Sequence, residues 1–362
     1  MKKNLLLIIG KYSYPVKGGI ENVTAFQEKI YRNYKGIHFV YFSNKKKSSS
    51  KIFSFKFISL FSQPISIRLF FWLYKNLNNY EYLELHTPNP LVMFYLLILN
   101  KNTKIVIHYH SDIVNQKFLN FFLEKLVKKT LSKSYFIIST SFRYVHFSNL
   151  LNKFNDKIKV IPPVLDNQRF KNESFTENLI KNKIKILSVG RFVKYKGFEI
   201  LIKSMNYLPE NYHLTLIGNG PLNKKFQLII NDLKLSKRIS IINKANDELL
   251  SKELKNCNVF VLPSINKSEA FGVVLLEALY FGRPLLTSNL FDSGVTEVNR
   301  ENVTGLYFEK LSPKDLSNKI TTIISELKKG NYSAKDLREY YDKYFSKEIT
   351  KMKYFDLYNI IN

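Results

Sequence analysis

The sequence contains little cysteine, no long apolar run and few acidic residues. Its single cysteine, Cys257, cannot form an internal disulfide, which is typical of proteins in reducing compartments. Cys257 opens an apolar run and is therefore expected to be an unreactive thiol in a core. The longest apolar run, residues 91–99, is much shorter than the roughly 20 residues that a membrane-spanning helix needs. These features predict a globular protein without a membrane span.

Targeting signals and repeats are also missing. Residues 5–9 form a short apolar segment behind two lysines, but no small-residue cleavage site follows it. We therefore interpret this segment as a buried first strand rather than a signal peptide, and we expect a cytoplasmic location. No internal repeat is visible, and the low-complexity stretch 45–50 is interpreted as an exposed loop.

Basic residues dominate the charge. The chain contains 56 Lys and Arg against 29 Asp and Glu, a formal net charge of +27. Residues 1–165 carry +18 of this charge, and residues 166–362 carry +9. A compositional bias toward lysine accounts for part of the excess, but such a bias should spread evenly. The asymmetry indicates an anionic partner of the first half, which is a membrane, a lipid phosphate or nucleic acid.

Short apolar segments alternate with helical patterns along most of the chain. Two domains are expected in 362 residues, because single cores rarely grow beyond about 250–300 residues. The alternation is the signature of parallel α/β sheets, with helices between successive strands. The expected strands are residues 5–9, 38–42, 82–86, 105–108, 135–138 and 159–161 in the first half, and 184–189, 214–217, 239–242, 259–262 and 284–287 in the second.

The alternation breaks at Pro162-Pro163 and resumes after a polar, irregular segment. This break predicts two Rossmann-like α/β domains, residues 1–165 and 166–345. Beyond them, Ile349, Met352 and Phe355 recur at helical spacing. They predict a final helix that packs one face on a domain.

A Glu-x7-Glu segment, Glu269 to Glu277, gives the strongest chemical signal, since it follows an expected strand and opens a helix. The helix is expected to begin near Gly272, so that the free amides of Phe271, Gly272 and Val273 point at a phosphate. The two carboxylates can then accept hydrogen bonds from sugar hydroxyls on either side of that phosphate. The alternative is an ordinary helix with an acidic first turn and one polar residue.

Two cations follow the first strand of the second half. Arg191 offers a planar fork and Lys196 a point charge, and both suit a pyrophosphate. The alternative is that both are solvated surface residues. Gly218 and Gly220 follow the next strand, but the third glycine of a dinucleotide fingerprint is missing, so NAD binding is not expected.

The first half carries two further candidate sites at the expected carboxyl ends of strands. Gly18 and Gly19 lie between a strand and a helix, where the backbone can approach a phosphate or substrate closely. His108 and His110 leave another strand. With one residue between them they are expected to point to opposite faces, so that only one faces the substrate. No third ligand accompanies them at a persuasive spacing, and no metal site is expected.

Together these motifs resemble family 4 of the retaining glycosyltransferases, which have the GT-B fold. The resemblance covers about residues 5–327 and rests on the Glu-x7-Glu segment and the Gly-Arg…Lys-Gly loop at 190–197. Three further stretches, residues 18–21, 108–114 and 293–298, are similar to bacterial surface-polysaccharide members. The resemblance implies two Rossmann-like domains with a cleft between them. It also implies that the C-terminal helix, residues 346–362, crosses back to the first domain.

The resemblance assigns roles in the second domain, which is expected to bind most of the donor. Glu277 is expected to hold the ribose hydroxyls, and Glu269 those of the donor sugar. Arg191 and Lys196 are expected to neutralise the departing pyrophosphate. Base contacts are expected from residues 243–247.

The first domain is expected to complete the donor site. Gly18 or Gly19 would approach the phosphate, and His110 would contact the donor sugar near its reacting carbon. No Asp-x-Asp motif is present, which agrees with a fold that needs no divalent metal. Substitution is expected at the front face, with the leaving phosphate helping to deprotonate the acceptor.

The expected function is retaining transfer of a hexose from a UDP- or GDP-linked donor to a lipid-linked saccharide, in surface-polysaccharide or O-antigen synthesis. No cofactor is expected. Two alternatives stand beside it. One is a GT-B-like sugar-nucleotide epimerase or phosphorylase. The other is a basic nucleic-acid-binding protein, although no RNA- or DNA-binding motif is present.

A peripheral position on the inner face of the plasma membrane is expected from residues 44–75. This segment holds seven Lys or Arg and no Asp or Glu. Its aromatic residues are expected to enter the interface of an anionic membrane. They are Phe53, Phe55, Phe57, Phe61, Phe70, Phe71 and Trp72. The alternative is that these aromatics belong to the core.

Overall fold

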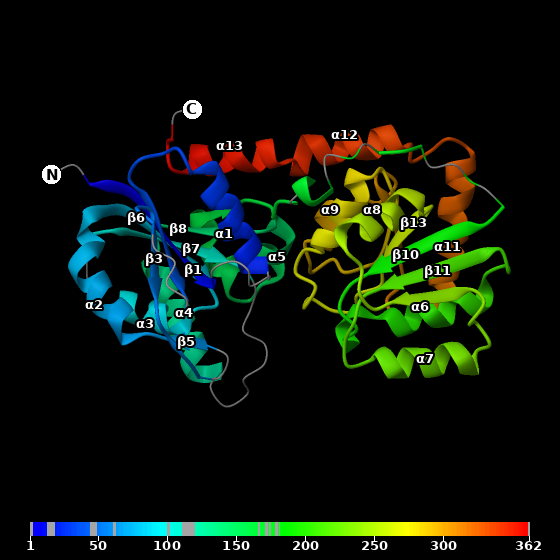
Figure 1. The fold of residues 1–362 in the computed structure, drawn as a ribbon, viewed down its shortest axis with the longest axis horizontal. Helices are drawn as coiled ribbons and strands as arrows, with labels where there is room; N and C mark the ends of the chain where they lie inside the picture. Colours follow the sequence, from blue (N-terminus) through cyan, green and yellow to red (C-terminus); the bar gives the residue numbers. More distant parts are fainter. Residues whose placement is uncertain are drawn as a thin grey trace. The chain divides into compact units, whose positions relative to one another are not determined.

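The structure is a computed structural model that describes residues 3–12, 19–43, 49–60, 63–99, 102–110, 120–165, 167–170, 173, 175–177, 180 and 182–360. The chain divides into two compact units, Met1–Pro162 and Pro163–Asn362, and each has its own parallel sheet (Figure 1). The division coincides with the break in the sequence pattern at Pro162-Pro163. The final helix is grouped with the second unit, and its return to the first domain stays a prediction.

The described part of the first unit contains a seven-stranded parallel sheet in the order β3-β2-β1-β6-β7-β8-β9. The strands are β1 (Asn4–Tyr12), β2 (Ile37–Phe42), β3 (Ile52–Phe55), β6 (Tyr80–Thr87), β7 (Lys104–Tyr109), β8 (Phe136–Ser139) and β9 (Ile158–Val160). The chain builds outward from β1 to β3 and then returns to β6 on the other side of β1. This creates a switch point between β1 and β6, and ligands of doubly wound sheets bind at the carboxyl ends of strands beside such a point.

Helices and a short hairpin surround this sheet. The helices are α1 (Gly19–Ile30), α2 (Ile67–Asn76), α3 (Pro90–Ile98), α4 (Asn120–Lys133) and α5 (Phe142–Phe147), and the hairpin strands are β4 (Ile58–Leu60) and β5 (Gln63–Ile65). Local sequence sets the helix starts: Ser141 caps α5 by accepting from the Tyr144 N–H, and Pro90 stands in the first turn of α3.

The second unit contains a six-stranded parallel sheet in the order β12-β11-β10-β13-β14-β15. Its strands are β10 (Ile184–Val189), β11 (Tyr212–Ile217), β12 (Ile239–Ile242), β13 (Val259–Leu262), β14 (Leu285–Ser288) and β15 (Gly305–Phe308). The switch point lies between β10 and β13. The carboxyl ends of these two strands are therefore the place to look for a ligand site.

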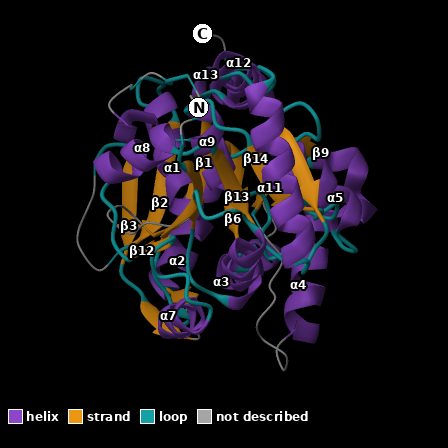
Figure 2. Ribbon diagram, turned by 90° about the vertical axis from the view of Figure 1, so that its right-hand side faces the viewer, coloured by secondary structure: helices purple, strands orange, loops and turns teal. Residues whose placement is uncertain are grey.

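Helices cover both faces of the second sheet. Alternate residues of β10 and β13 enter two separate hydrophobic clusters, as the period of two in a strand requires. Helices α6 (Phe198–Ser204), α7 (Asn223–Asp232) and α11 (Pro313–Lys328) complete one cluster, and α8 (Asp247–Asn256), α9 (Val273–Tyr280) and α12 (Ala334–Phe345) complete the other. The remaining helices are α10 (Val295–Val298) and α13 (Lys347–Leu357). Figure 2 colours the strands of each sheet orange and their covering helices purple.

Every strand expected from the sequence is present, within one or two residues at most ends. Strands β3, β4, β5 and β15 were not expected. Cys257 is buried, and burial raises the pKa of its thiol to about 12, which confirms the expectation of an unreactive core cysteine. No helix in the described ranges combines the length and the apolar character that a membrane crossing requires.

Candidate active site

The loops that follow β10 and β13 lock together at the carboxyl edge of the second sheet. Gly197 has φ 67°, and a Cβ there would lie 1.9 Å from the carbonyl oxygen of Pro263. The N–H of Ile265 donates to the carbonyl of Tyr195 at 2.8 Å. Only glycine permits this close contact of two backbones. The contact brings the loop that carries Lys196 against the loop that leads to Glu269.

Lys196 and Glu269 form a nearly buried pair at this contact. The Nζ of Lys196 donates to the Oε2 of Glu269 at 2.5 Å, and the hydroxyl of Ser264 donates to the same oxygen at 2.8 Å. The side chains of Lys196 and Glu269 are 11% and 10% exposed. The Oε1 of Glu269 has no partner within the described part of the chain. One oxygen of the carboxylate is thus held by the protein, and the other can accept a hydrogen bond from a ligand.

The amino end of α9 lies next to this pair in the sequence. Gly272 precedes the helix with φ 76°, and a Cβ there would approach the Leu262 side chain to 2.9 Å, so glycine is required. Among the described residues, none accepts a hydrogen bond from the amides of Phe271, Gly272 or Val273. These free amides and the positive end of the helix dipole suit an anion, as the sequence predicts.

The Ser293–Gly294 segment supports the Glu269 loop from the other side. The Ser293 hydroxyl donates to the carbonyl of Glu269, and the Gly294 N–H donates to the carbonyl of Ala270 at 2.9 Å. Both residues belong to the stretch 293–298, which the sequence singles out only by resemblance. Their hydrogen bonds fix the backbone from which the Glu269 side chain projects.

Glu277 is buried in α9 and pairs with an arginine that the sequence did not indicate. The Nη1 of Arg169 donates to Glu277 at 3.0 Å, and its Nε donates to Asp247 at 3.0 Å. Burial raises the pKa of the Glu277 carboxyl to about 7, although the charge of Arg169 acts in the opposite direction. Glu277 is therefore balanced between its two protonation states near neutral pH.

Arg191 differs from Lys196 because its guanidinium is exposed and has no partner in the described ranges. Its loop is held against the neighbouring one: the Phe192 N–H donates to the carbonyl of Asn219 at 2.9 Å. An unpaired guanidinium on a fixed loop is suited to capture an anion. The structure thus joins Lys196 to Glu269 but leaves Arg191 separate from both.

An open pocket of about 560 Å³ lies at the start of α8. Its lining residues are Lys244, Asn246, Glu248, Leu249 and Lys252. Two of them fall within residues 243–247, where base contacts are expected.

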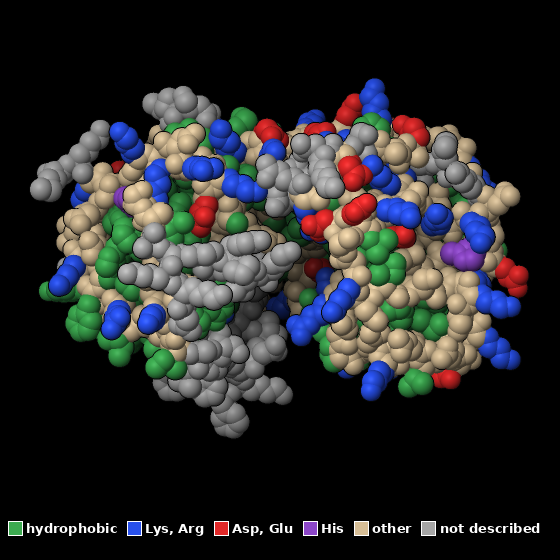
Figure 3. Space-filling model, viewed as in Figure 1, with side chains coloured by type: hydrophobic (Ala, Val, Ile, Leu, Met, Phe, Trp, Pro, Cys, Tyr) green, Lys and Arg blue, Asp and Glu red, His purple; other side chains and the backbone are tan. Residues whose placement is uncertain are grey.

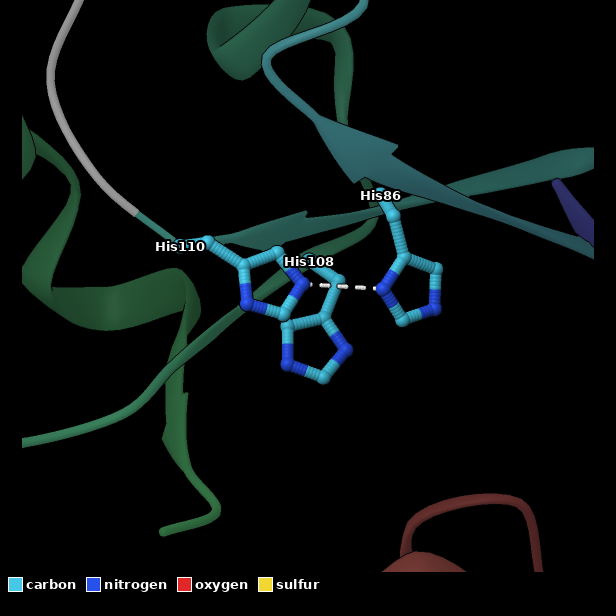
Figure 4. A group of neighbouring side chains, drawn as sticks. All are labelled: His86, His108 and His110. Atoms are coloured by element: carbon cyan, nitrogen blue, oxygen red, sulfur yellow. Dashed lines mark hydrogen bonds between the residues drawn. The ribbon is translucent and has the colours of Figure 1, made fainter. Parts of the chain in front are cut away.

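Three histidines gather at the carboxyl ends of β6 and β7 in the first unit (Figure 4). The rings of His108 and His110 stack with centroids 4.3 Å apart and an angle of 6° between planes. The expectation that these two side chains point to opposite faces is therefore wrong, because residues two apart on a strand share a face. His86 joins them from the adjacent strand, and its Nδ1 lies 2.9 Å from the Nε2 of His110.

A buried carboxylate lies beneath the histidines. Glu84 is inaccessible to solvent, and it receives hydrogen bonds from Gln27 at 2.7 Å and from the Nδ1 of His108 at 2.9 Å. Burial alone would raise the pKa of the Glu84 carboxyl, but hydrogen bonds from His108 and His86 hold it well below its ordinary value. Burial lowers the pKa of His108 to about 4 and that of His110 well below its ordinary value, so both rings are neutral.

The three histidines are also a group that could hold a metal ion, since their ring nitrogens lie within 4.8 Å of one another. Their orientation does not favour chelation. The rings of His86 and His110 meet end to end, with centroids 5.1 Å apart, and their facing nitrogens share one hydrogen bond. A metal ligand must direct its lone pair at the ion. In the His86–His110 contact one such lone pair is used within the cluster.

The remaining predicted residues of the first unit are only partly described. Gly18 lies outside the described residues, and Gly19 is the first residue of α1. His110 is partly exposed at the end of β7.

Sequence reasoning missed five residues of the two sites: Ser264, Arg169, His86, Gln27 and Glu84. His86 and Glu84 stand in the expected strand 82–86, so a polar pair in a fully buried strand was an available signal. Nothing in the sequence distinguishes Arg169 or Gln27 from surface residues.

Comparison with known proteins identifies the second unit. Residues 170–344 match the sequence model of a family described as glycosyl transferases group 1. The O-antigen chain mannosyltransferase C of Escherichia coli is 26% identical over 317 residues, which cover 86% of this chain and 83% of that protein. The D-rhamnosyltransferase WbpZ of Pseudomonas aeruginosa is 28% identical over 233 residues, 63% of this chain and 60% of that protein.

Solved structures share the fold of the whole chain. Anabaena Alr3699/HepE in complex with UDP has a TM-score of 0.74 at 16% identity, covering 98% of this chain and 100% of that one. Together with the two parallel sheets, this similarity confirms the GT-B fold that the sequence motifs imply.

Proposed function

Because the chain carries a glycosyl transferases group 1 domain and is a glycosyltransferase, we propose that it transfers a hexose from a nucleoside-diphosphate sugar to a lipid-linked saccharide. The proposed reaction retains the anomeric configuration and serves the synthesis of O-antigen or another surface polysaccharide. The names of the Escherichia coli and Pseudomonas aeruginosa relatives support this pathway class. The UDP complex of the Anabaena protein supports a nucleotide-bound donor.

The observation that carries the proposal is the Lys196–Glu269 pair beside the free amides of α9. A phosphate at the amino end of α9 would meet the amides, and the nearby sugar would present hydroxyls to the free Oε1 of Glu269. Lysine offers three N–H donors, of which one is used on Glu269. The others can stabilise negative charge as the nucleoside diphosphate leaves, and such preorganised electrostatic stabilisation usually accelerates a reaction more than any other single effect.

Retention rests on the resemblance to family 4, which supports front-face substitution with the leaving phosphate helping to deprotonate the acceptor. We further propose that the reaction needs no divalent metal. Lys196, Arg191 and the α9 amides supply the positive charge that a metal would otherwise supply at the phosphates.

Thermal-shift measurement with UDP-, GDP- and TDP-linked hexoses tests the donor assignment. A ligand at about 100 times its dissociation constant adds about 2.7 kcal/mol to the free energy of unfolding, and this gain should persist in EDTA. A gain with only one nucleotide identifies the base. The proposal fails if no nucleotide sugar raises the melting temperature. The proposal that no divalent metal is needed fails if EDTA abolishes the gain in stability.

The proposed location is the anionic inner face of the plasma membrane. An apolar face on α2 and α3 supports it: Ile67, Phe71 and Tyr74 lie on one side of α2, and Phe94 and Ile98 on α3, each more than half exposed. The rings of Phe70 and Tyr95 tie the two helices together, with centroids 5.1 Å apart. Figure 3 shows this region at the lower left, with hydrophobic and basic side chains side by side.

The structure corrects which residues form this face. Of the aromatic residues expected to enter a membrane, Phe71 is exposed, whereas Phe53 and Phe55 pack on Trp72 with ring centroids 4.9 and 5.7 Å away. Phe57 contacts Tyr12 and Phe42, Phe70 contacts Tyr95, and Phe61 lies outside the described residues. Among the described rings only Phe71 is exposed, and the others are half-buried against neighbouring rings without belonging to the buried core.

The structure also distinguishes bound from exposed basic residues among those that it describes in residues 44–75. Lys51 donates to the carbonyls of Arg32 and Tyr34, both at 2.7 Å. Its ammonium is therefore bound by the segment that follows α1 in the sequence. Lys45, Lys46 and Lys47 lie outside the described residues. Arg68 and Lys75 are exposed on α2 beside the apolar face, and these two support electrostatic attraction to an anionic leaflet.

A further inference from the structure

Arg169 lies between two carboxylates that belong to different helices of the second unit. Its Nε donates to the Oδ1 of Asp247, the first residue of α8, at 3.0 Å. Its Nη1 donates to the Oε1 of Glu277 in α9, also at 3.0 Å. Among the described residues, no other cation forms an ion pair with either carboxylate. Arg169 is therefore the cation that compensates both charges.

Buried neighbours hold Arg169 in place. Leu165 and Phe170, close to it on either side in the sequence, belong to a buried hydrophobic cluster of the second unit. The guanidinium carbon lies 4.8 Å from the centroid of the Phe170 ring, and that ring packs on Phe281, directly after α9, with centroids 5.1 Å apart. A guanidinium stacked on a fixed ring loses little further freedom when it pairs with a carboxylate. Arg169 thus fixes the position of the Glu277 carboxylate.

The charge of Glu277 also depends on this arginine. The Glu277 side chain is only 9% exposed, and burial favours the neutral acid unless a cation compensates the charge. Burial raises the pKa of the Glu277 carboxyl to about 7, against the effect of Arg169, which lowers it, and together with Asp247, which raises it. Loss of Arg169 would raise this pKa further and leave Glu277 mostly protonated at neutral pH.

Arg169 uses one oxygen of Glu277 and leaves the other available. Within the described part of the chain, the Oε2 of Glu277 has no hydrogen-bond partner. An ionised carboxylate only accepts hydrogen bonds, and each of its oxygens has room for two. The open pocket at the start of α8 is lined by Asn246 and Glu248, the sequence neighbours of Asp247, so space for a ligand opens beside the residue on the other side of Arg169.

We propose that Arg169 is a positioning residue of the donor site, which holds Glu277 by Oε1 so that Oε2 accepts the 2′- and 3′-hydroxyls of the donor's ribose. The inference rests on the proposed function and deepens it, because it makes Arg169 the residue on which preference for a ribonucleotide over a deoxyribonucleotide depends. Arg169 itself touches no ligand. Lys196 holds Glu269 in the same manner, by one oxygen.

Binding of UDP, GDP and their 2′-deoxy forms to the full chain tests the proposal. We expect titration calorimetry at pH 7 to show that the wild type binds a ribonucleotide about tenfold or more tightly than its 2′-deoxy form, the effect of one hydrogen bond to a charged acceptor. In Arg169→Gln this ratio should fall to about threefold or less. An equal loss of affinity for both forms would mean that Arg169 contacts the ligand directly, and a gain for both would mean that it blocks the site. Either result would overturn the proposal.

Arg338→Gln is the matched control. Arg338 pairs with Asp342 at 3.0 Å, and its guanidinium carbon lies 4.1 Å from the centroid of the Tyr280 ring, the last residue of α9. Its loss removes a paired, ring-stacked arginine from the same helix end, but it leaves the ion pair of Glu277 in place. Arg338→Gln should keep the wild-type preference for the ribonucleotide. A preference lowered equally in both variants would indicate general loosening of α9 and contradict the proposal.

The pH dependence of the ratio separates the role of Arg169 from structural damage. In the wild type the preference should grow as the pH rises through about 7, where Glu277 ionises. In Arg169→Gln it should grow only at higher pH, because loss of the guanidinium raises the pKa of Glu277. The same midpoint in both proteins would contradict the proposal.

A second variant covers the case in which Arg169→Gln does not fold. Arg169→Lys keeps the charge but lacks the planar fork that reaches both carboxylates, so it should also lower the ratio, though less. An unchanged ratio in Arg169→Lys would overturn the proposal. Equal binding of ribonucleotide and deoxyribonucleotide by the wild type would reject the inference and leave the nucleotide-bound donor standing. Binding of none of the four nucleotides by the wild type would reject the proposed function, and the inference with it.

Discussion

Lys196 and Glu269 hold each other in place before any ligand binds. Their pairing offsets the cost of burying two charges in the loop contact between β10 and β13. A bound phosphate would share the lysine without releasing it, since the ammonium has more than one donor. In the proposed reaction the ammonium of Lys196 is thus a fixed cation near the place where charge develops as the nucleotide leaves.

Removal of either cation near the phosphate should slow turnover. We expect Lys196→Ala and Arg191→Ala each to lower kcat about 10²-fold or more, the effect of losing one preorganised charge stabiliser. Lys194→Ala is the matched control, because Lys194 is an exposed cation of the same loop. Steady-state kinetics on folded variants, checked by circular dichroism, measures the effect. Comparable rates in all three variants would show that the site charges are not used.

Glu277 should make donor binding depend on pH. Its pKa near 7 leaves roughly a tenth of the carboxyl ionised at pH 6 and roughly nine tenths at pH 8. Acceptance of two ribose hydroxyls needs the carboxylate, so nucleotide affinity should rise about tenfold over this interval. Titration calorimetry at several pH values measures it, and Glu277→Gln should remove the dependence. A flat profile in the wild type would contradict the ribose assignment.

The same pKa has the opposite consequence for stability. The folded state holds the proton of Glu277 more tightly than the unfolded chain, where the ordinary value is 4.5. Its contribution to stability is therefore present in full below that value and is lost as the pH rises through about 7.

Among the secondary-structure elements, the contact of the β10 and β13 loops determines the geometry of the site. Gly197→Ala should place a Cβ on the carbonyl of Pro263 in addition to the cost of a left-handed alanine, about 1–2 kcal/mol. Gly330→Ala is the control, since Gly330 has φ +87° with open space around it. Thermal melts should show a small loss for Gly330→Ala, and a larger loss with impaired donor binding for Gly197→Ala. Equal melting temperatures would show that the loops are not locked.

The sequence predicted those elements whose residues are apolar and flanked by turns, which is why the central strands of both sheets were found. Strands β3 and β5 were missed because they are short and lie at an edge or in a hairpin, where burial imposes little pattern. The Glu-x7-Glu segment located α9 because the segment follows an expected strand and contains Gly272, near which the helix was expected to begin. The partners Arg169 and Gln27 were missed because their contacts join residues distant in sequence, and no local pattern encodes them.

At the scale of the whole molecule, most of the excess positive charge and the exposed apolar face of α2 and α3 belong to the first unit. Each basic residue near an anionic surface contributes about 1 kcal/mol, so several acting together suffice for reversible binding. We expect the protein to co-sediment with anionic liposomes and less with neutral ones. The difference should shrink with salt, as the Debye length falls from about 10 Å at 0.1 M to about 3 Å at 1 M.

Two variants separate the charge from the apolar face. Arg68→Gln with Lys75→Gln should weaken binding to anionic vesicles at low salt, and Ile67→Ser with Phe71→Ser should weaken it at every salt concentration. Leu228→Ser is the control, because Leu228 is an exposed apolar residue of α7 in the other unit. Equal binding to neutral and anionic vesicles would remove the electrostatic part of the membrane proposal. No binding to either kind of vesicle would remove the membrane proposal as a whole. Both outcomes would leave the enzyme assignment untouched.

A transfer assay with the nucleotide sugar that gives the largest thermal shift tests the proposed chemistry itself. A lipid-linked saccharide acceptor should gain one hexose in step with release of nucleoside diphosphate, in EDTA as in buffer. Proton coupling at the new anomeric carbon should show the configuration of the donor. Glu269→Gln should retain the nucleotide affinity of the wild type and lose most of the turnover. Consumption of the nucleotide sugar without gain by any acceptor, or a product with inverted configuration, would contradict the assignment as a retaining hexosyltransferase.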